Sequence, residues 1–400
     1  MPQTAAMDLA RARYLSSPAG QSALASIPGD WAALPLNALA TRLRTLFPAA
    51  EAAALGEQVS LRNQAGDRLW HPEALLSADG LQMATHPKVA ARRAARLAAT
   101  GLRLGDLTAG LGSDLWACIQ AGIDAAGVER DAATAVLCAS NTEGRAVRGD
   151  ALQAPCEPER MAILLDPSRR DPSGRRLAPA AFLPAWEDAM GVARSAKTAV
   201  VKGPPGINHS DIPPEAEVEF IQLGRALREA ALWFGQGAKP GLRRAILLPA
   251  DATLSSDDPE GSEAVVPPGE FVFDPESCVT RAGLVRHLGA RVGGMLMDPH
   301  VAYLTAGAPA FDPLCATFEV VDVLPFSVGR LKRVLRQRGW QATEIRRRAF
   351  PIEPDELRKL LGHHQGEDVT LMCTTLGGRR TVIIGRRLRS EDETANGCRQ

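Results

Sequence analysis

Four acidic residues follow four short apolar runs, at positions where carboxylates could act together on one ligand. Asp106, Glu129, Asp150 and Asp166 end the β-rich segments LRLGD, DAAGVE, RAVRGD and MAILLD. Helical segments separate these runs, so the pattern predicts a parallel sheet with crossover helices. The carboxyl ends of such strands meet at one edge of the sheet, where ligands bind in a crevice. Carboxylates there can accept hydrogen bonds from the hydroxyl and amino groups of a ligand.

A glycine-containing turn joins the first of these runs to the next helix. Gly110 and Gly112, in the run GDLTAGLGSD, let a ligand approach the backbone and aim the helix N-terminus at it. A dinucleotide fingerprint would need a third glycine where Leu115 stands, so a nicotinamide oxidoreductase is a weaker alternative. The spacing of Asp106, Gly110 and Gly112 instead resembles motif I of the class I S-adenosylmethionine (SAM) methyltransferases.

The resemblance to motif I implies that SAM is the cofactor. Asp106 would face the ammonium group of its methionine part, and Asp114 would belong to the same site at the start of the helix. Glu129 would accept hydrogen bonds from both ribose hydroxyls, and Asp150 would accept one from the adenine amino group. No metal ion is expected, because the histidines and cysteines lack the spacing of a metal site.

The fourth strand end carries the residues expected to face the methyl acceptor. Methyltransferases acting on exocyclic amines use an Asp-Pro corner, where a carboxylate and a carbonyl orient the amine. Asp166 and Pro167 match this corner, whereas Ser168 replaces a second proline and Arg169 replaces a stacking aromatic residue. An arginine could stack on a base or grip a phosphate. Asp166, Pro167 and Arg169 are therefore the expected catalytic residues.

The loop that follows the fifth run, KGPPGINH, is expected to form a wall of the substrate pocket. Lys202 and Asn208 are its candidate contacts with substrate. A different chemistry, attack of Cys156 on carbon 5 of a cytosine, is rejected. That cysteine precedes the fourth strand and lies in the polar loop APCEPER, away from the expected edge.

Composition excludes several classes of protein. Of the 400 residues, 45% are apolar and 23% are charged, and 46 Lys and Arg balance 46 Asp and Glu. This is the range of an ordinary globular protein. No apolar run reaches the roughly 18–20 residues that a membrane helix needs. The seven cysteines are scattered without a CxxC pair, so we expect a reducing, cytoplasmic location.

The chain divides into four predicted parts, with an α/β fold of the doubly wound, Rossmann-like type at its centre. Residues 1–95 have helical spacing, and residues 96–250 form the methyltransferase domain. Residues 251–320 comprise an acidic linker and a small ferredoxin-like module, and residues 321–390 form a basic α+β module. The linker prediction depends on eight acidic residues and no lysine or arginine between positions 251 and 276.

The terminal module is strongly basic although the whole chain is neutral. Between Pro325 and Ser390 there are 15 Lys and Arg against 6 Asp and Glu, which gives a formal charge of +9. Such a surface attracts phosphate backbones. Arg333, on a predicted helix, and Arg346, Arg347 and Arg348, on a predicted strand, are the candidate contacts with structured RNA.

These runs together resemble a bacterial family of class I SAM-dependent methyltransferases with a C-terminal THUMP-like domain. The segments that carry the resemblance include DLTAGLGSD, LLDPSRR, VKGPPGINHSDIP and LPFSVGRLKRVLRQRGW. The segment GLQMATHPKVAARRAARLAA is also similar to one in trimethylguanosine synthase, which implies that Thr85 bounds the cofactor pocket. The family implies the ferredoxin-like insert and suggests RNA, often tRNA.

Three functions follow from these observations. The first is methylation of a base nitrogen in structured RNA, either tRNA or rRNA. The second is methylation of a small molecule or a protein. The third is a non-catalytic RNA-binding protein that keeps a SAM fold, which the complete set of edge acids disfavours.

Overall fold

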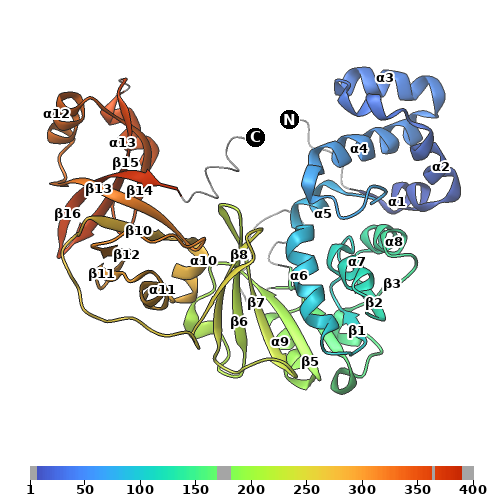
Figure 1. Ribbon diagram of the computed structural model, residues 1–400. Helices are drawn as coiled ribbons and strands as arrows, with labels where there is room; N and C mark the ends of the chain where they lie inside the picture. Colours follow the sequence, from blue (N-terminus) through green and yellow to red (C-terminus); the bar gives the residue numbers. More distant parts are fainter. Residues whose placement is uncertain (1–6, 169–181, 363–364, 390–400) are drawn as a thin grey trace. The chain divides into compact units, whose positions relative to one another are not determined.

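The computed structural model describes residues 7–168, 182–362 and 365–389. The chain divides into two compact units, one formed by Met1–Val218 with Ala230–Gly241 and the other by Glu219–Glu229 with Leu242–Gln400. Figure 1 labels the helices and strands of both units. None of the helices in the described part of the chain has the length and hydropathy that a bilayer crossing requires.

The first unit begins with short helices, as their apolar spacing predicts. They are α1 (Leu9–Ser16), α2 (Pro18–Ser26), α3 (Leu36–Leu46), α4 (Ala49–Ala65), α5 (Ala78–Met83) and α6 (Pro87–Ala98). Polar side chains begin several of them: Ser17 accepts a hydrogen bond from the backbone NH of Gly20 at 3.1 Å, and Ser77 does so from that of Gly80 at 3.2 Å. Such N-caps satisfy helix donors that would otherwise lack a partner.

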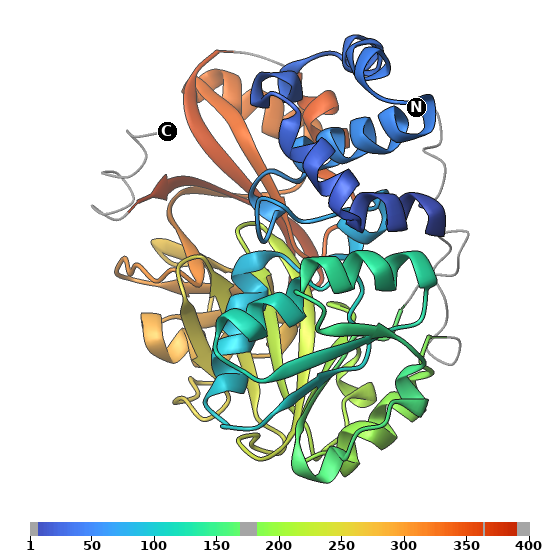
Figure 2. The same ribbon diagram turned by 90° about the vertical axis from the view of Figure 1, so that its right-hand side faces the viewer.

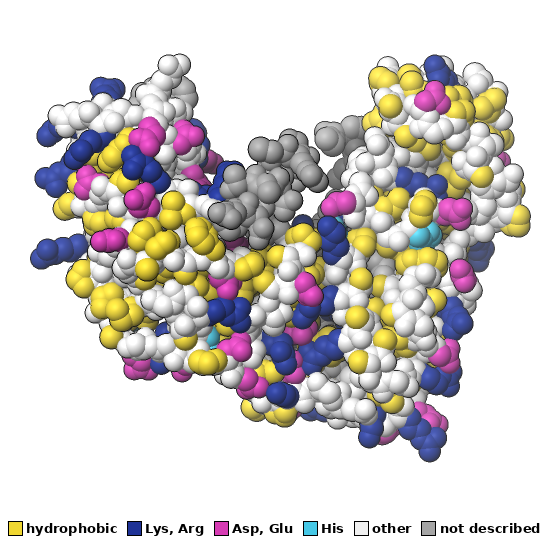
Figure 3. All heavy atoms as spheres, in the orientation of Figure 1, with side chains coloured by type: hydrophobic (Ala, Val, Ile, Leu, Met, Phe, Trp, Pro, Cys, Tyr) yellow, Lys and Arg dark blue, Asp and Glu magenta, His cyan; other side chains and the backbone are white. Residues whose placement is uncertain are grey.

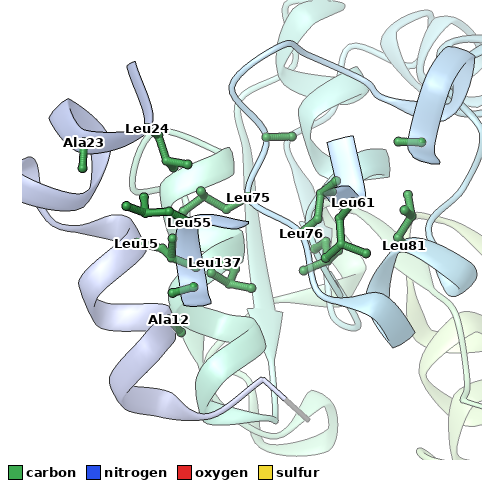
Figure 4. Close-up of a cluster of buried hydrophobic side chains, with 14 of the residues drawn as sticks. Ala12, Leu15, Ala23, Leu24, Leu55, Leu61, Leu75, Leu76, Leu81 and Leu137 are labelled. Carbon is green, nitrogen blue, oxygen red and sulfur yellow. The ribbon is translucent and has the colours of Figure 1, made fainter. Parts of the chain in front are cut away.

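The N-terminal helices bury one apolar face against the α/β part of the unit. Leu15, Leu55 and Leu75 are fully buried together with Leu137 of α8, a helix from the central region (Figure 4). Asn141, also on α8, links the two regions by polar contacts. Its Oδ1 accepts from the backbone NH of Leu75 at 2.7 Å, and its Nδ2 donates to the carbonyl of Leu111 at 2.9 Å. The helical region therefore supports the glycine turn that contains Leu111.

The central part of the first unit is a parallel sheet with crossover helices, as the sequence predicts. Its elements are β1 (Leu104–Asp106), α7 (Ser113–Gln120), β2 (Ala125–Glu129), α8 (Ala132–Asn141), β3 (Ala146–Arg148), β4 (Ala162–Leu165), α9 (Trp186–Ser195) and β5 (Thr198–Gly203). The strand order is β3-β2-β1-β4-β5, and all these pairs are parallel. Strand β7 (Ala226–Gly235) runs antiparallel beside β5. Figure 2 shows the parallel strands with α6 and α7 beside them.

The strand order places β1 at the centre, between β2 and β4. Leu104 lies opposite Ala125 on one side and opposite Ala162 on the other. The chain reverses its direction of travel across the sheet between β3 and β4, because β4 returns to the far side of β1. Ligands bind at such a switch point, outside the carboxyl ends of the strands. The predicted acids at the ends of β1, β2 and β4 are therefore on one sheet edge.

The second unit holds two groups of strands. Strands β6 (Glu217–Leu223), β8 (Arg243–Leu248) and β9 (Ala252–Ser255) follow one another in sheet order, with β8 and β9 antiparallel. A seven-stranded sheet has the order β11-β12-β10-β13-β16-β15-β14. The strands of this sheet and the helices between them in the chain are β10 (Phe271–Pro275), α10 (Ser277–Ala282), α11 (Val285–Val292), β11 (Met295–Asp298), β12 (Val301–Ala306), β13 (Cys315–Pro325), α12 (Val328–Arg338), β14 (Trp340–Arg347), α13 (Pro354–Leu361), β15 (Glu367–Leu376) and β16 (Arg379–Leu388).

The structure corrects two predicted features of this region. The expected boundary between residues 320 and 321 falls inside β13, which pairs with β10 on one side and β16 on the other. The two predicted parts on either side of this boundary therefore share one continuous sheet. The expected linker at 251–276 contains strands β9 and β10, and its Asp274 is buried. Negative charge in a sequence favours exposure, but Asp274 has two arginine partners that compensate for its burial.

Candidate functional site

The glycine turn between β1 and α7 has the backbone that its sequence predicts. Gly110 and Gly112 have φ angles of +55° and +89°, a region that residues with a side chain rarely adopt. A Cβ atom on Gly112 would lie 2.7 Å from Cγ2 of Thr142, so this position needs glycine for space as well. A Cβ on Gly110 would meet no atom within 4 Å. The backbone at Gly110 therefore borders open space at the sheet edge.

Asp106, at the end of β1, is a buried carboxylate that the protein pairs incompletely. Its side chain is 1% exposed, and Oδ1 accepts a 3.2 Å hydrogen bond from the backbone NH of Thr108. Oδ2 is buried and has no hydrogen-bond partner among the described residues. Burial, and then the negative charge of Asp114, raise the pKa of Asp106 to about 8. A buried oxygen without a partner is costly, so this atom is suited to accept from a ligand.

Glu129, at the end of β2, lies beside the same turn. Its Oε2 accepts from the backbone NH of Gly110 at 3.0 Å, and its Oε1 accepts from that of Asp131 at 2.7 Å. Burial raises the pKa of Glu129, and these two NH groups oppose that effect. Each carboxylate oxygen can accept a further hydrogen bond. The carboxylate is thus held in place with capacity for a diol.

Asp150 follows β3 and begins a short 3-10 helix, Ala151–Gln153. Its Oδ1 accepts from the backbone NH of Leu152 at 2.9 Å, and the side chain is half-buried. The residue therefore has a local capping role, and its place at the third strand end is the one that the sequence predicts. Its contact with an adenine stays a prediction.

Asp114 and Thr85, both predicted at the cofactor site, contact each other instead of presenting free polar atoms. Thr85 Oγ1 donates to Asp114 Oδ2 at 2.5 Å, and both residues are buried. Asp114 Oδ1 forms an ion pair with Arg93 of α6, which is also buried. Lys202 Nζ, from β5, lies 3.3 Å from Asp114 Oδ2. Although burial alone would raise the pKa of Asp114, Arg93 and Lys202 lower it to about 2.

The corner after β4 is tied to the glycine turn. The backbone NH of Asp166 donates to Thr108 Oγ1 at 2.5 Å, so one threonine contacts both Asp106 and Asp166. The Asp166 side chain is 33% exposed, and Lys202 Nζ forms an ion pair with its Oδ2. Pro167 is buried. Arg169 lies outside the described residues.

Lys202 and Asn208, the two residues predicted to contact substrate, are both engaged by other side chains of the protein. The Lys202 side chain is only 9% exposed, and its ammonium lies among Thr85, Asp114 and Asp166. It therefore belongs to the acid cluster. Asn208 is exposed, and its Nδ2 donates to Oδ2 of Asp211 at 3.0 Å, within the same turn. A local hydrogen bond thus engages this side chain.

The three consecutive arginines after Ile345 are not the open basic surface that their sequence predicts. Arg346 and Arg348 pair with the buried Asp274 at 2.5 and 2.6 Å, and their side chains are 24% and 22% exposed. Arg347 pairs with Glu353 and donates to the carbonyl of Phe350. These arginines join β14 to β10 and to the start of α13. By contrast, Arg333 lies on the exposed face of α12.

Two residues of the site were missed from the sequence. Arg93 looks like one of several arginines on an amphipathic helix, yet it is 2% exposed. Its signal was its place on the apolar face, between Val89 and Leu97, which are also buried. Thr108 lies inside the glycine motif. The spacing of acids and glycines does not predict that this threonine contacts residues at the ends of both β1 and β4.

The residues at this edge fit SAM. The free Oδ2 of Asp106 suits an ammonium group, and Glu129 can accept from a diol. The open space beside Gly110 leaves room for a nucleoside between them. Among the described residues, no group of three His, Cys, Asp or Glu is placed to hold a metal ion.

Comparisons with known proteins agree with this geometry. Residues 315–387 match the model of the THUMP domain-like family, and residues 8–65 match a domain of unknown function. Two Mycobacterium tuberculosis proteins, from strains CDC 1551 and H37Rv, are 32% identical over 311 residues, covering 76% of this chain and 85% of theirs. Both are named uncharacterized S-adenosylmethionine-dependent methyltransferases.

A crystal structure from Porphyromonas gingivalis W83 that bears a methyltransferase name has the same fold. It superposes with a TM-score of 0.71 at 22% identity, covering 92% of this chain and 99% of the other. The expected cofactor and the doubly wound fold are thus confirmed. This chain belongs to the class I SAM-dependent methyltransferases that carry a C-terminal THUMP-like domain.

Proposed function

We propose that this methyltransferase transfers a methyl group to a base nitrogen of structured RNA. The observation that carries the proposal is the exposed basic face of α12, inside the THUMP-like residues 315–387. Arg330, Arg333 and Arg336 are all exposed, and in the described part of the chain they have no acidic partner within ion-pair distance. They recur every three residues, so they line one side of the helix.

The other side of α12 explains why this face is open to solvent. Leu331 and Leu335 are 2% and 0% exposed and belong to the core of the seven-stranded sheet. Figure 3 shows Lys and Arg side chains over the region where Figure 1 places α12. An A-form helix is bound mainly through its shape and its phosphates, which suits a row of unpaired guanidinium groups.

The acceptor side of the site supports a nitrogen as the methylated atom. Asp166 is ion-paired through one oxygen and is one-third exposed, so it can accept a hydrogen bond from an amine. Accepting that hydrogen orients the nitrogen and keeps its lone pair directed at the methyl group. When bound, SAM supplies an electrophilic methyl group. Asp106 and Glu129 would hold its ammonium and ribose, and the protein's contribution to the transfer would be mainly positioning.

The substrate class is tested in cells by mass spectrometry of nucleosides. Nucleosides from the tRNA and rRNA of a deletion strain are compared with those of the parent and of a strain complemented with Asp166→Asn. We expect one methylated nucleoside to be lost on deletion and to stay lost with the variant. Unchanged RNA nucleosides would contradict an RNA substrate and would favour a small molecule or a protein.

The basic face is tested in vitro with an unmodified tRNA transcript as the probe. Replacing Arg330, Arg333 and Arg336 with Gln should weaken binding. It should also flatten the log–log dependence on salt by roughly 0.7–0.9 for each phosphate that the protein no longer neutralises. Arg13, Arg42 and Arg44, exposed arginines of the N-terminal helices, provide a matched control triple. An equal effect of both triples would show that general charge, and not this face, determines RNA binding.

A further inference from the structure

Lys202 connects the acceptor corner to the helices that precede the glycine turn. Its ammonium contacts Asp166 Oδ2, lies 2.7 Å from Thr85 Oγ1 and lies 3.3 Å from Asp114 Oδ2. These partners come from the end of β4, from the residue before the N-cap of α6, and from the first turn of α7. Arg93 of α6 holds the other oxygen of Asp114.

The arrangement is unlike that of a lysine that binds substrate. A substrate-binding ammonium on the pocket wall would be exposed, whereas only 9% of the Lys202 side chain is. Asp166 is the most exposed member of the cluster, at 33%, so the accessible atoms belong to the carboxylate. In the described part of the chain, Lys202 contacts only one of the two oxygens of Asp166. The other oxygen remains available to an acceptor.

We propose that Lys202 is a positioning residue that holds the Asp166 carboxylate in the orientation that accepts the substrate's hydrogen. This inference rests on the proposed role of Asp166 at the acceptor corner. Lys202 fixes Oδ2 from the side of β5, and Thr108 fixes the backbone NH of the same residue from the side of β1. Side chain and backbone of Asp166 are thus held from both neighbouring strands.

The physical reason is that amine orientation tolerates little freedom in the group that accepts the hydrogen. A misplacement of about 1 Å can cost on the order of 100-fold in rate. Without its ammonium partner, Asp166 could rotate, and the buried Asp114 would lose one of its cations. We therefore expect Lys202→Met to reduce kcat by roughly 100-fold while KM for the RNA stays within about twofold.

The experiment compares three single variants, Lys202→Met, Lys202→Arg and Asp166→Asn. It also includes the double variant that combines Lys202→Met with Asp166→Asn. Lys197→Met is the matched control, because Lys197 is an exposed lysine that directly precedes β5. Rates are measured as transfer of tritiated methyl from SAM to small RNA from a deletion strain. Calorimetry gives the affinities for SAM and for S-adenosylhomocysteine, the product that lacks the sulfonium charge. If Lys202→Met does not fold, Lys202→Gln replaces it.

Three results would support the proposal. Lys202→Arg should restore most of the rate, and Lys202→Met should have no further effect when Asp166→Asn is present. Removing the ammonium should also raise the affinity for SAM relative to S-adenosylhomocysteine by roughly three- to tenfold, because the cluster becomes more negative. The control variant should match the unsubstituted chain in all measurements.

Other results would overturn it. A raised KM for RNA with an unchanged kcat would make Lys202 a substrate contact, and multiplicative losses in the double variant would separate it from Asp166. If the unsubstituted chain methylates no RNA, the RNA assignment fails, and the affinity ratio still decides the role of Lys202. If Lys202→Met leaves the ratio of the affinities for SAM and S-adenosylhomocysteine unchanged, the Lys202 ammonium does not act at the cofactor edge, and the proposal is rejected.

Discussion

The substitution Asp106→Asn tests whether a buried proton is displaced when SAM binds. Asp106 is 1% exposed, its Oδ2 has no partner among the described residues, and its pKa is raised to about 8. We therefore expect the free protein to hold a proton on this carboxyl group at neutral pH. A cationic ammonium at Oδ2 favours the ionised form. We predict that binding of SAM releases this proton to solvent.

The size of the effect follows from linkage between protonation and binding. At pH 6.5, a group with a pKa of about 8 is roughly 97% protonated, so about one proton should be released per SAM bound. The affinity should then rise with pH by up to about tenfold per unit below pH 8. The useful window is pH 6 to 7.5, because the α-amino group of SAM, with a pKa of about 7.7–8.0, stays mostly charged there.

Calorimetry in buffers with different ionisation enthalpies counts the protons directly. For Asp106→Asn we expect no proton release and a SAM affinity that no longer depends on pH in this window. Its affinity should approach that of the unsubstituted chain at pH 6 and fall behind it as the pH rises. Asp124→Asn is the control, since Asp124 is an exposed aspartate of the same unit, paired with Arg103 and Arg145.

Equal proton release by Asp106→Asn and the unsubstituted chain would refute this reasoning. The proton would then belong to another group, and Glu129, whose pKa burial also raises, would be examined next. The charges that face Asp106 are those of Asp114, Asp166 and Lys202. A variant that removes the charge of one of these three residues should shift the pH at which the release declines.

The remaining predictions concern turnover and stability. Asp166→Asn should lower kcat for methyl transfer by roughly 100-fold, leaving a measurable rate, while the calorimetric affinity for SAM stays within about threefold. A fully active variant would remove Asp166 from the catalytic residues. Asp106→Asn should raise the thermal midpoint of the cofactor-free chain, and the increase should grow from pH 4 to pH 8. In this pH range the unsubstituted chain takes up a proton at Asp106 when it folds, so its stability falls as the pH rises. A difference in thermal midpoint that stays constant with pH would contradict this prediction. Arg346→Met should lower the free energy of unfolding by about 1.5–3 kcal/mol in a denaturant titration, because the buried Asp274 loses a charged partner, and it should leave the salt dependence of RNA binding unchanged. Leu137→Ala should cost about 2–5 kcal/mol, since Leu137 is fully buried between α8 and the N-terminal helices, and a change below about 1 kcal/mol would show that this cluster is not close-packed.

The parallel part of the fold was predictable because strand ends are local features. Each of the four apolar runs is short, ends in an acid and is followed by a helical segment. Strands β1, β2, β3 and β4 begin and end within about two residues of these runs. The parallel arrangement follows from the crossover helices. Asp106, Glu129 and Asp166 therefore reached the same edge in the structure by a rule that needs no knowledge of distant contacts.

The partners of those residues were not predictable, because they depend on contacts between distant segments. Lys202 meets Asp166 across 36 residues and Thr85 across 117, and neither separation corresponds to a local spacing. The arginines 346–348 show the opposite error. A run of three positive charges is usually exposed, but Asp274, about 70 residues earlier, brings two of them into ion pairs with a buried carboxylate. Charge counts located the basic module without showing which side of it faces solvent.

Two aspartates at the carboxyl edge of the parallel strands show how position alone gives the same side chain different electrostatic properties. Asp114 has Arg93, Lys202 and Thr85 as partners, so it stays ionised although it is buried. Asp106 has one backbone donor and a negative neighbour, so its charge is unfavourable until a cation arrives. The protein thus pairs Asp114 and Asp166 with its own cations and leaves Asp106 without a cation among the described residues. A substitution that places a lysine or arginine side chain beside Asp106 should therefore weaken SAM binding more than Asp106→Asn does. The added cation would pair with Asp106 and would also occupy the space of the ammonium group.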